Sequence, residues 1–126
     1  MKKLLYLASA SHGDREKLRE LQLLLSTSSF MVYSPCLGFC GTESESLRSR
    51  IMAHCLRMVS DSDVFLGYLE GAPTDGLWQE VALAQEAHKP LAFLVTQRVY
   101  AIPTKYVNEN VFFDSKHVSR WLHELS

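Results

Sequence analysis

Apolar positions along the chain follow two patterns, short continuous runs and longer segments with helical spacing. The continuous runs predict buried β-strands at Leu4–Ala8, Phe30–Pro35, Val64–Leu69, Leu91–Val95 and Val111–Phe113. The helical spacing predicts helices that follow Asp14, begin near Ser44, span Asp75–Lys89 and span Ser115–Leu125. Residues 96–110 follow neither pattern, so we expect an irregular connection there.

The predicted strands and helices alternate along the chain, which is typical of βαβ units and a parallel sheet. The sequence therefore predicts one α/β domain over residues 1–126, with a three-layer, doubly wound, flavodoxin-like or Rossmann-like fold. We expect about five parallel strands with helices on both faces. Ligands in such folds bind outside the carboxyl ends of the strands. The loops to examine are therefore "SASHGD", "PCLGFCGTE" and "EGAPTDG", which follow the first three strands.

Composition narrows the choice of partner. Thirteen Lys and Arg residues nearly balance fourteen Asp and Glu residues, which argues against nucleic acid or a membrane surface and favours a small molecule. The three cysteines form no CxxC motif and the five histidines lack ligand spacing, so we expect neither a metal site nor a cofactor. The opening "MKKLLYLASAS" resembles a signal peptide, but its apolar run is too short, so we expect a cytoplasmic protein.

The stretch "DSDVFLGYLEGAPTDGLWQE" concentrates five carboxylates around a predicted strand. Asp61 and Glu70 are interpreted as solvated turn acids, and Asp75 as a cap of the following helix. Asp63 adjoins the apolar run and is a candidate to enter the crevice. Glu80 falls in the early turns of a helix, on the same side as small residues that leave space before its carboxylate. The simpler alternatives are a turn carboxylate at Asp63 and a solvated helix residue at Glu80.

The first strand and the loop after it add further candidates. Tyr6 lies inside the apolar run, where its buried hydroxyl needs a partner such as a carboxylate, although a core tyrosine bonded to backbone is the simpler alternative. The loop offers Ser9, Ser11 and Gly13 before a helix whose amides and dipole could hold a phosphate or a 5′-hydroxyl. An ordinary strand-to-helix turn would contain the same residues.

Together, "LLYLASAS" and "VSDSDVFLGYLEGAPTDGLWQEVALAQEAHKPLAFLV" resemble the nucleoside 2-deoxyribosyltransferase family, whose superfamily includes nucleoside 5′-monophosphate N-glycosidases. The residues that carry the resemblance are Tyr6, Asp63, Asp75, Gly76, Glu80, Ala82, Ala84, Lys89 and Pro90. The resemblance is good from about residue 44 to 95, fair over the first 35 and poor beyond 96. Ala82 replaces the usual glycine of the family. Trp78 is bulkier than the residues often found near that position and would narrow the base pocket.

The resemblance implies a role for each matched residue. Glu80 would be the nucleophile, Tyr6 the hydroxyl that orients it, and Asp63 a carboxylate that binds substrate or donates a proton. Substrate contacts would come from Asp75, Gly76, Trp78, Ser9, Ser11 and Gly13. Such an enzyme cleaves the N-glycosidic bond of a nucleoside and transfers the 2-deoxyribosyl group to another base through a covalent intermediate on Glu80. The family also implies a homo-oligomer.

Two alternatives to the transferase remain open at this point. A nucleoside 5′-monophosphate N-glycosidase would use the same nucleophile and release the sugar to water. A nucleotide-binding or signalling module would keep the cleft without turnover, because fold does not fix function. In every case the expected partner is a small nucleoside or nucleotide.

Overall fold

The computed structural model describes residues 2–9, 15–35, 44–70, 75–96, 102 and 109–126. The strands are β1 (Lys3–Ser9), β2 (Phe30–Tyr33), β3 (Val64–Leu69), β4 (Leu91–Val95) and β5 (Asn110–Phe112). The helices are α1 (Arg15–Leu25), α2 (Glu45–Asp61), α3 (Asp75–Glu86) and α4 (Ser115–Leu125). The order of elements predicted from the apolar pattern is thereby confirmed, with ends that differ by a few residues.

All five strands belong to one parallel sheet, in the order β2-β1-β3-β4-β5. This is the flavodoxin-like order of a doubly wound fold, as the sequence predicted. The order reverses between β1 and β3, where Tyr6 lies opposite Phe65 and Ser9 opposite Tyr68. A crevice is therefore expected outside the carboxyl ends of these two strands.

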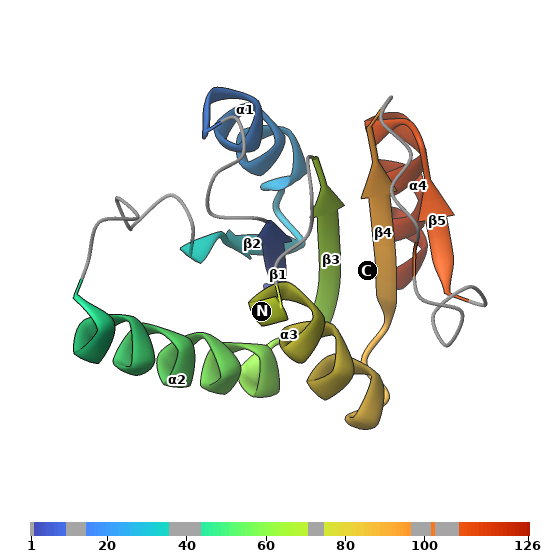
Figure 1. Ribbon diagram of the computed structural model, residues 1–126. Helices are drawn as coiled ribbons and strands as arrows, with labels where there is room; N and C mark the ends of the chain where they lie inside the picture. The colour runs from blue at the N-terminus through green and yellow to red at the C-terminus, as the bar shows by residue number, and fades with distance from the viewer. Residues whose placement is uncertain (1, 10–14, 36–43, 71–74, 97–101, 103–108) are drawn as a thin grey trace.

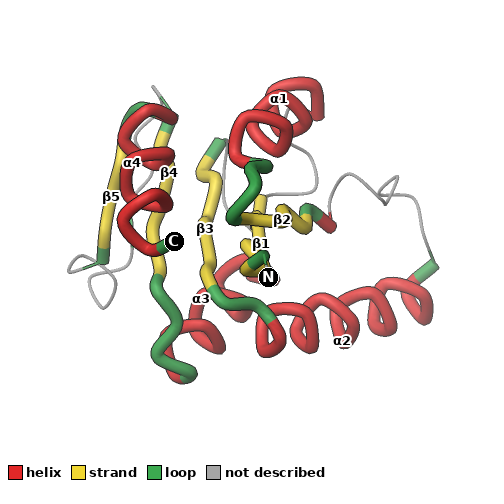
Figure 2. The backbone as a smooth tube through the Cα atoms, turned by 180° about the vertical axis from the view of Figure 1, so that it is seen from behind, coloured by secondary structure: helices red, strands yellow, loops and turns green. Residues whose placement is uncertain are grey.

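Helices cover both faces of the sheet. Figures 1 and 2 show α1 and α4 on one face and α2 and α3 on the other, which gives three layers. On the first face, Leu18, Leu21 and Leu25 of α1 and Val118 and Leu122 of α4 pack against the sheet. On the second face, a separate apolar cluster joins Cys55 and Val59 of α2 and Leu77, Val81 and Ala84 of α3 to the sheet.

The second face carries the side chains that alternate with the first-face core along each strand. Tyr6 and Ala8 of β1 point to it, together with Phe65 of β3 and Phe93 of β4. Gly67 lies between Ala8 and Phe93 in the register, and a Cβ there would lie 2.9 Å from Phe93 Cδ1. Glycine at this position therefore allows the Phe93 ring to lie directly against the backbone of β3.

Local sequence accounts for the ends of several helices. The Ser44 hydroxyl accepts a hydrogen bond from Leu47 N and caps α2 at its amino end. The Asp114 carboxylate caps α4 in the same way through Lys116 N. The left-handed backbone of His88, at φ 56°, follows α3 and turns the chain toward β4. None of the helices within the described residues is long and apolar enough to span a membrane.

Candidate active site

Tyr6 and Glu80 come from different elements and meet on the second face of the sheet. Tyr6 lies in the middle of β1 and is fully buried. Glu80 lies in the second turn of α3, on the helix side that also buries Leu77, Val81 and Ala84. Spacings of three and four residues place these four side chains on one stripe of the helix. The sequence of α3 therefore directs a carboxyl group toward the sheet among otherwise apolar neighbours.

Burial dominates the electrostatics of Glu80. The residue is only 8% exposed, although a glutamate in a helix is normally solvated. Burial penalises the charged form and raises the pKa of the Glu80 carboxyl to about 7, while the neighbouring Tyr6 hydroxyl, as a potential hydrogen-bond donor, lowers it in part. A carboxyl group with this pKa exists in both protonation states near neutral pH.

The Tyr6 hydroxyl is affected by the same pairing in the opposite sense. Burial raises the pKa of Tyr6 well above its usual range, and the Glu80 carboxylate and the Cys55 thiol raise it further. The Tyr6 side chain is therefore uncharged, and its hydroxyl is a potential hydrogen-bond donor to the Glu80 carboxyl group. Within the described part of the chain, neither Tyr6 Oη nor Glu80 Oε2 has a hydrogen bond of good geometry. Both atoms are buried, and each retains the capacity to form a hydrogen bond.

Aromatic rings lie on both sides of Tyr6. The Tyr6 ring stacks on Phe65, with centroids 5.5 Å apart, and it contacts the Tyr33 ring at 5.8 Å. Tyr33 belongs to β2 and lies opposite Tyr6 in the parallel register. Its hydroxyl lies 3.1 Å from Nε2 of His54 on α2. The Tyr6 hydroxyl is therefore held in a mostly apolar setting that contains a few polar groups.

Asp63 does not join this pair. It lies at the amino end of β3, at the edge of the sheet opposite the expected crevice. Its Oδ2 accepts a hydrogen bond of 2.8 Å from Leu4 N, and its own N donates to Leu4 O at 2.8 Å. The exposed Asp63 carboxylate therefore connects β3 to β1, which is the turn-carboxylate alternative raised by the sequence.

Glu70 is the acid that the sequence interpretation missed. It follows the carboxyl end of β3, the edge at which ligands bind in this fold. Its side chain is 23% exposed and pairs loosely with Lys17, at 3.8 Å. Its Oε2 is buried and lacks a hydrogen-bond partner among the described residues. Its position directly after a strand was a usable signal, because the direction of a parallel strand shows which edge a following residue reaches.

The other sequence candidates are placed as follows. Ser9 ends β1 at the carboxyl edge, and exposed Asp75 begins α3 as its first residue. Half-buried Gly76 follows it in the first turn. Successive residues of an α-helix are rotated by about 100°, so Trp78 and Glu80, two residues apart, lie about 160° apart around the helix axis. The Trp78 ring meets the edge of Phe93, with centroids 6.1 Å apart, so it packs toward β4 and away from the acid. Ser11 and Gly13 lie outside the described residues.

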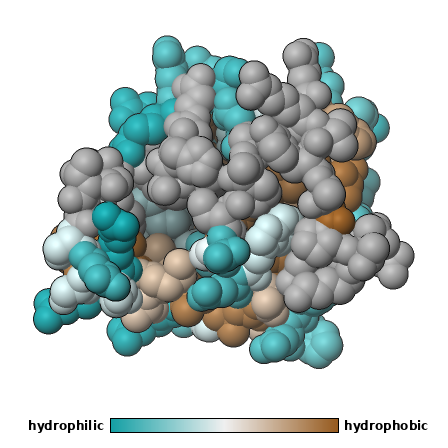
Figure 3. All heavy atoms as spheres, in the orientation of Figure 1, coloured by the Kyte–Doolittle hydropathy of each residue, from teal (hydrophilic) through white to brown (hydrophobic). Residues whose placement is uncertain are grey.

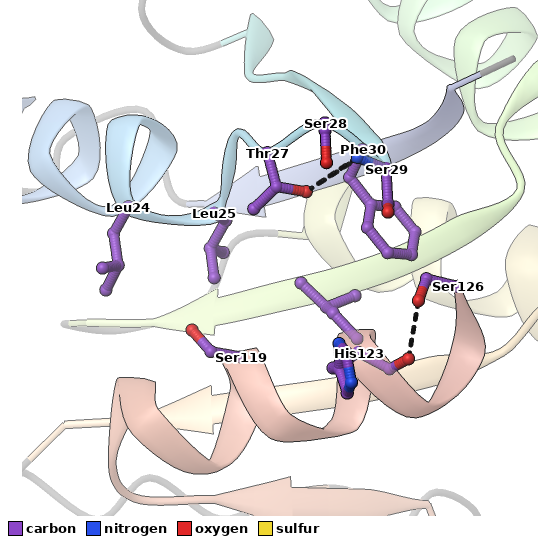
Figure 4. Close-up of a pocket in the computed structure, with 10 residues that line it drawn as sticks. Leu24, Leu25, Thr27, Ser28, Ser29, Phe30, Ser119, His123 and Ser126 are labelled. Atoms are coloured by element: carbon purple, nitrogen blue, oxygen red, sulfur yellow. Dashed lines mark hydrogen bonds between the residues drawn. The ribbon is translucent and has the colours of Figure 1, made fainter.

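A cavity of about 300 Å³ lies on the other face of the molecule. Leu24, Leu25 and Phe30 line it from α1 and β2, and Ser119 and His123 line it from α4 (Figure 4). The sheet separates this cavity from Glu80. Among the serines that line the cavity, Ser126 donates a hydrogen bond from its hydroxyl to His123 O. Among the described residues, no group of three or more His, Cys, Asp or Glu side chains could hold a metal ion.

The arrangement suits nucleophilic chemistry with proton control. A carboxylate freed from water is reactive, and a neutral tyrosine can donate a hydrogen bond to it without accepting its charge. Apolar surface is exposed low on the same face, where α2 and α3 meet (Figure 3). The described features are a buried acid, Glu80, beside a tyrosine with aromatic neighbours, and a second carboxyl, Glu70, near the switch point in strand order.

Comparison with solved structures places this fold among known proteins. The 2-deoxyribosyltransferase of Bacillus psychrosaccharolyticus matches with a TM-score of 0.70 and 19% identity over 92% of this chain and 90% of that one. The CMP N-glycosidase BcmB of Clostridium botulinum matches with a TM-score of 0.62 and 14% identity over 98% and 100%. Both are proteins of the kind that the sequence resembles, and the fold implied by that resemblance is confirmed.

The same scaffold also carries other chemistry. The flavoenzyme NAD(P)H:acceptor oxidoreductase FerB of Paracoccus denitrificans matches with a TM-score of 0.51 and 14% identity over 75% of this chain and 61% of that one. No family model and no curated protein matches the sequence. The class defined here is therefore a three-layer, flavodoxin-like α/β fold shared with 2-deoxyribosyltransferases, and the activity must be argued from the site.

Proposed function

We propose that this protein cleaves the N-glycosidic bond of nucleosides or nucleotides, with Glu80 as the nucleophile. The single observation that carries the proposal is the buried Glu80 carboxyl facing the neutral Tyr6 hydroxyl. The two matched enzymes, a 2-deoxyribosyltransferase and a CMP N-glycosidase, act on substrates with such a bond and support the choice of reaction.

In the proposed first step, a Glu80 oxygen forms a bond to C1′ as the bond from C1′ to the base nitrogen breaks. The electron pair of that bond leaves with the base, which takes up a proton from water. Positive charge develops on the sugar in the transition state, and the carboxylate beneath C1′ stabilises it. In the second step, another base or water attacks C1′, loses a proton and releases Glu80 as a carboxylate.

Tyr6 and Glu70 have separate roles in this proposal. Tyr6 is the hydrogen-bond donor for the ionised Glu80 carboxylate, and it keeps part of that group ionised near neutral pH despite its burial. Glu70 offers a buried oxygen at the carboxyl edge of β3 for a sugar hydroxyl or for the departing base. Asp63 is left out of the reaction because its carboxylate is bonded to the backbone of β1.

One observation favours the hydrolase as the second candidate. Arg15 and Lys17 lie in the first turns of α1, which follows the carboxyl end of β1. Cations at that edge suit a substrate that carries a 5′-phosphate. The transferase remains the first choice because Lys17, one of these two cations, already has the Glu70 carboxylate 3.8 Å away.

The test is a base-release assay on the purified protein. We expect release of free base from a 2′-deoxynucleoside, and Glu80→Gln is expected to lower the rate by roughly 10³-fold or more because the nucleophile is lost. The matched control is Glu86→Gln, an exposed glutamate of the same helix, which should retain the activity. A Glu80→Gln protein as active as the parent would refute the nucleophile, and an inactive parent would favour the binding module.

The same assay separates the alternatives. A second free base added to a deoxynucleoside should yield a new nucleoside if the protein is a transferase. A 5′-monophosphate that is cleaved to free sugar phosphate faster than the nucleoside would instead identify the hydrolase. The homo-oligomer implied by the family resemblance is proposed here too, and multi-angle light scattering of the purified chain measures it directly.

A further inference from the structure

A second tyrosine lies beside the proposed nucleophile. Tyr33 faces the same side of the sheet as Tyr6, because the two residues are paired in the parallel register of β1 and β2. Their ring centroids are 5.8 Å apart and the planes are tilted by 47°. The Tyr6 ring is therefore held between Phe65 on one side and Tyr33 on the other.

The hydroxyl of Tyr33 is fixed from the opposite direction by His54. His54 Nε2 and Tyr33 Oη are 3.1 Å apart, and the rings meet edge to face with centroids 6.1 Å apart. His54 is exposed on α2, whereas its neighbour Cys55 is buried against the sheet. The helix thus presents one residue to the surface and the next to the Tyr6 hydroxyl.

Tyr33 also interacts with the acid itself. Burial raises the pKa of the Tyr33 hydroxyl, and the Cys55 thiol and the Glu80 carboxylate raise it further. The same two groups act on Tyr6. Four polar groups from β1, β2, α2 and α3 therefore lie close enough to influence one another: Tyr6, Tyr33, Cys55 and Glu80. The hydrogen bond between Tyr33 and His54 connects this cluster to the surface.

We propose that Tyr33 and His54 form a positioning pair, in which the bond between them fixes the Tyr33 ring and, through ring contact, the Tyr6 hydroxyl that faces Glu80. The inference rests on the proposed function of Glu80. A structural role alone explains the bond poorly, because a hydrogen bond to an exposed histidine contributes little to stability. In contrast, a hydrogen bond that limits the motion of a ring next to the proposed nucleophile helps to keep the reacting groups correctly positioned.

The experiment compares Tyr33→Phe, His54→Ala and the double variant with the parent chain. Tyr33→Phe retains the ring and removes the hydroxyl, whereas His54→Ala removes the other partner at an exposed position. His54→Gln restores a side chain that can bond to Tyr33 and is the rescue variant. The matched control is His117→Ala, which removes an exposed histidine from α4 on the other face of the sheet.

The first readout does not depend on activity. It follows the ¹³C resonance of the Glu80 side-chain carboxyl during a pH titration. Tyr6 lowers the pKa of Glu80, so a looser Tyr6 should let it rise; we expect a shift of about 0.5 unit in each single variant. The double variant should shift no further than either single variant, because both remove the same bond. His54→Gln and His117→Ala should titrate like the parent.

The second readout is the kinetics of base release. We expect kcat to fall roughly fivefold in Tyr33→Phe and His54→Ala with KM unchanged, as for groups that act on the transition state. Unchanged Glu80 titration and unchanged kcat in both variants would overturn the positioning pair, as would additive effects in the double variant. The proposed function can fail separately, if the parent chain is inactive while the variants still shift Glu80.

Discussion

At the Glu80 carboxyl, two physical effects act against each other. Burial disfavours the carboxylate, and the neighbouring Tyr6 hydroxyl favours it as a potential hydrogen-bond donor. Burial is the larger effect, so the pKa of Glu80 lies at about 7 where a free glutamate would lie at 4.5. A carboxylate in this state has lost the water that would weaken it as a nucleophile, yet a large fraction of it is ionised at neutral pH.

The proposed mechanism predicts how the reaction depends on pH. Only ionised Glu80 can attack C1′, so kcat should decrease as the pH falls below about 7, the pKa of this carboxyl. Tyr6→Phe removes the donor that lowers this pKa and should move the acid limb to higher pH, with a roughly tenfold lower kcat at pH 7. The measurement is kcat between pH 5 and 9 for both proteins. Coincident acid limbs would show that Tyr6 does not act on Glu80.

The sequence singled out Tyr6 and Glu80, which the structure buries on the same face of the sheet, but it did not predict where the acids Asp63 and Glu70 lie. The burial of Tyr6 was predictable because it lies inside an apolar run, whereas Glu80 was a candidate only because small residues share its side of the helix. Asp63 was favoured for its closeness to the strand, although the amino end of a parallel strand lies on the wrong edge. The buried oxygen of Glu70 depends on packing between distant elements, which spacing alone does not reveal.

The elements themselves were predicted closely, and the differences have local causes. The second strand ends at Tyr33, before Pro35, because proline has no N–H to donate to a ladder. In α2, Leu47 stands at the helical spacing of the buried Cys55 and Val59, yet it is 45% exposed. Figure 1 shows the reason, since the amino-terminal turns of α2 extend past β2 at the edge of the sheet. Helical periodicity cannot show how far a helix extends beyond its sheet.

The bond between β3 and β1 through Asp63 gives a prediction for an element. Asp63→Ala removes the acceptor of Leu4 N, and we expect it to lower the free energy of unfolding by about 1 kcal/mol. Since this carboxylate lies away from Glu80, kcat should stay within about twofold of the parent value. Urea unfolding and the base-release assay measure the two quantities. A large loss of kcat in a stable Asp63→Ala protein would return Asp63 to the site.

At the scale of the whole molecule, the strand order explains why these residues meet. With the order β2-β1-β3-β4-β5, β1 lies between β2 and β3, so Tyr6 has Tyr33 on one side and Phe65 on the other. The helix after β3 then returns over this row and presents Glu80 to it. The alternation of elements predicted the parallel sheet, but the contact between Tyr6 and Glu80 depends on this order, which many sequences share with different chemistry.

Glu80 also predicts how the stability of the whole fold depends on pH. Its pKa is higher in the folded chain than its ordinary value of 4.5, so the folded state binds this proton more tightly than the unfolded state. The contribution is fully present below pH 4.5 and is lost as the pH rises through about 7, which amounts to about 3 kcal/mol. Glu80→Gln carries no such proton. Relative to the parent, this variant should therefore gain stability between pH 5 and pH 8, by about 2 to 3 kcal/mol in urea unfolding. Glu86→Gln should show no such gain, and parallel stability curves for Glu80→Gln and the parent would mean that Glu80 ionises like a solvated glutamate.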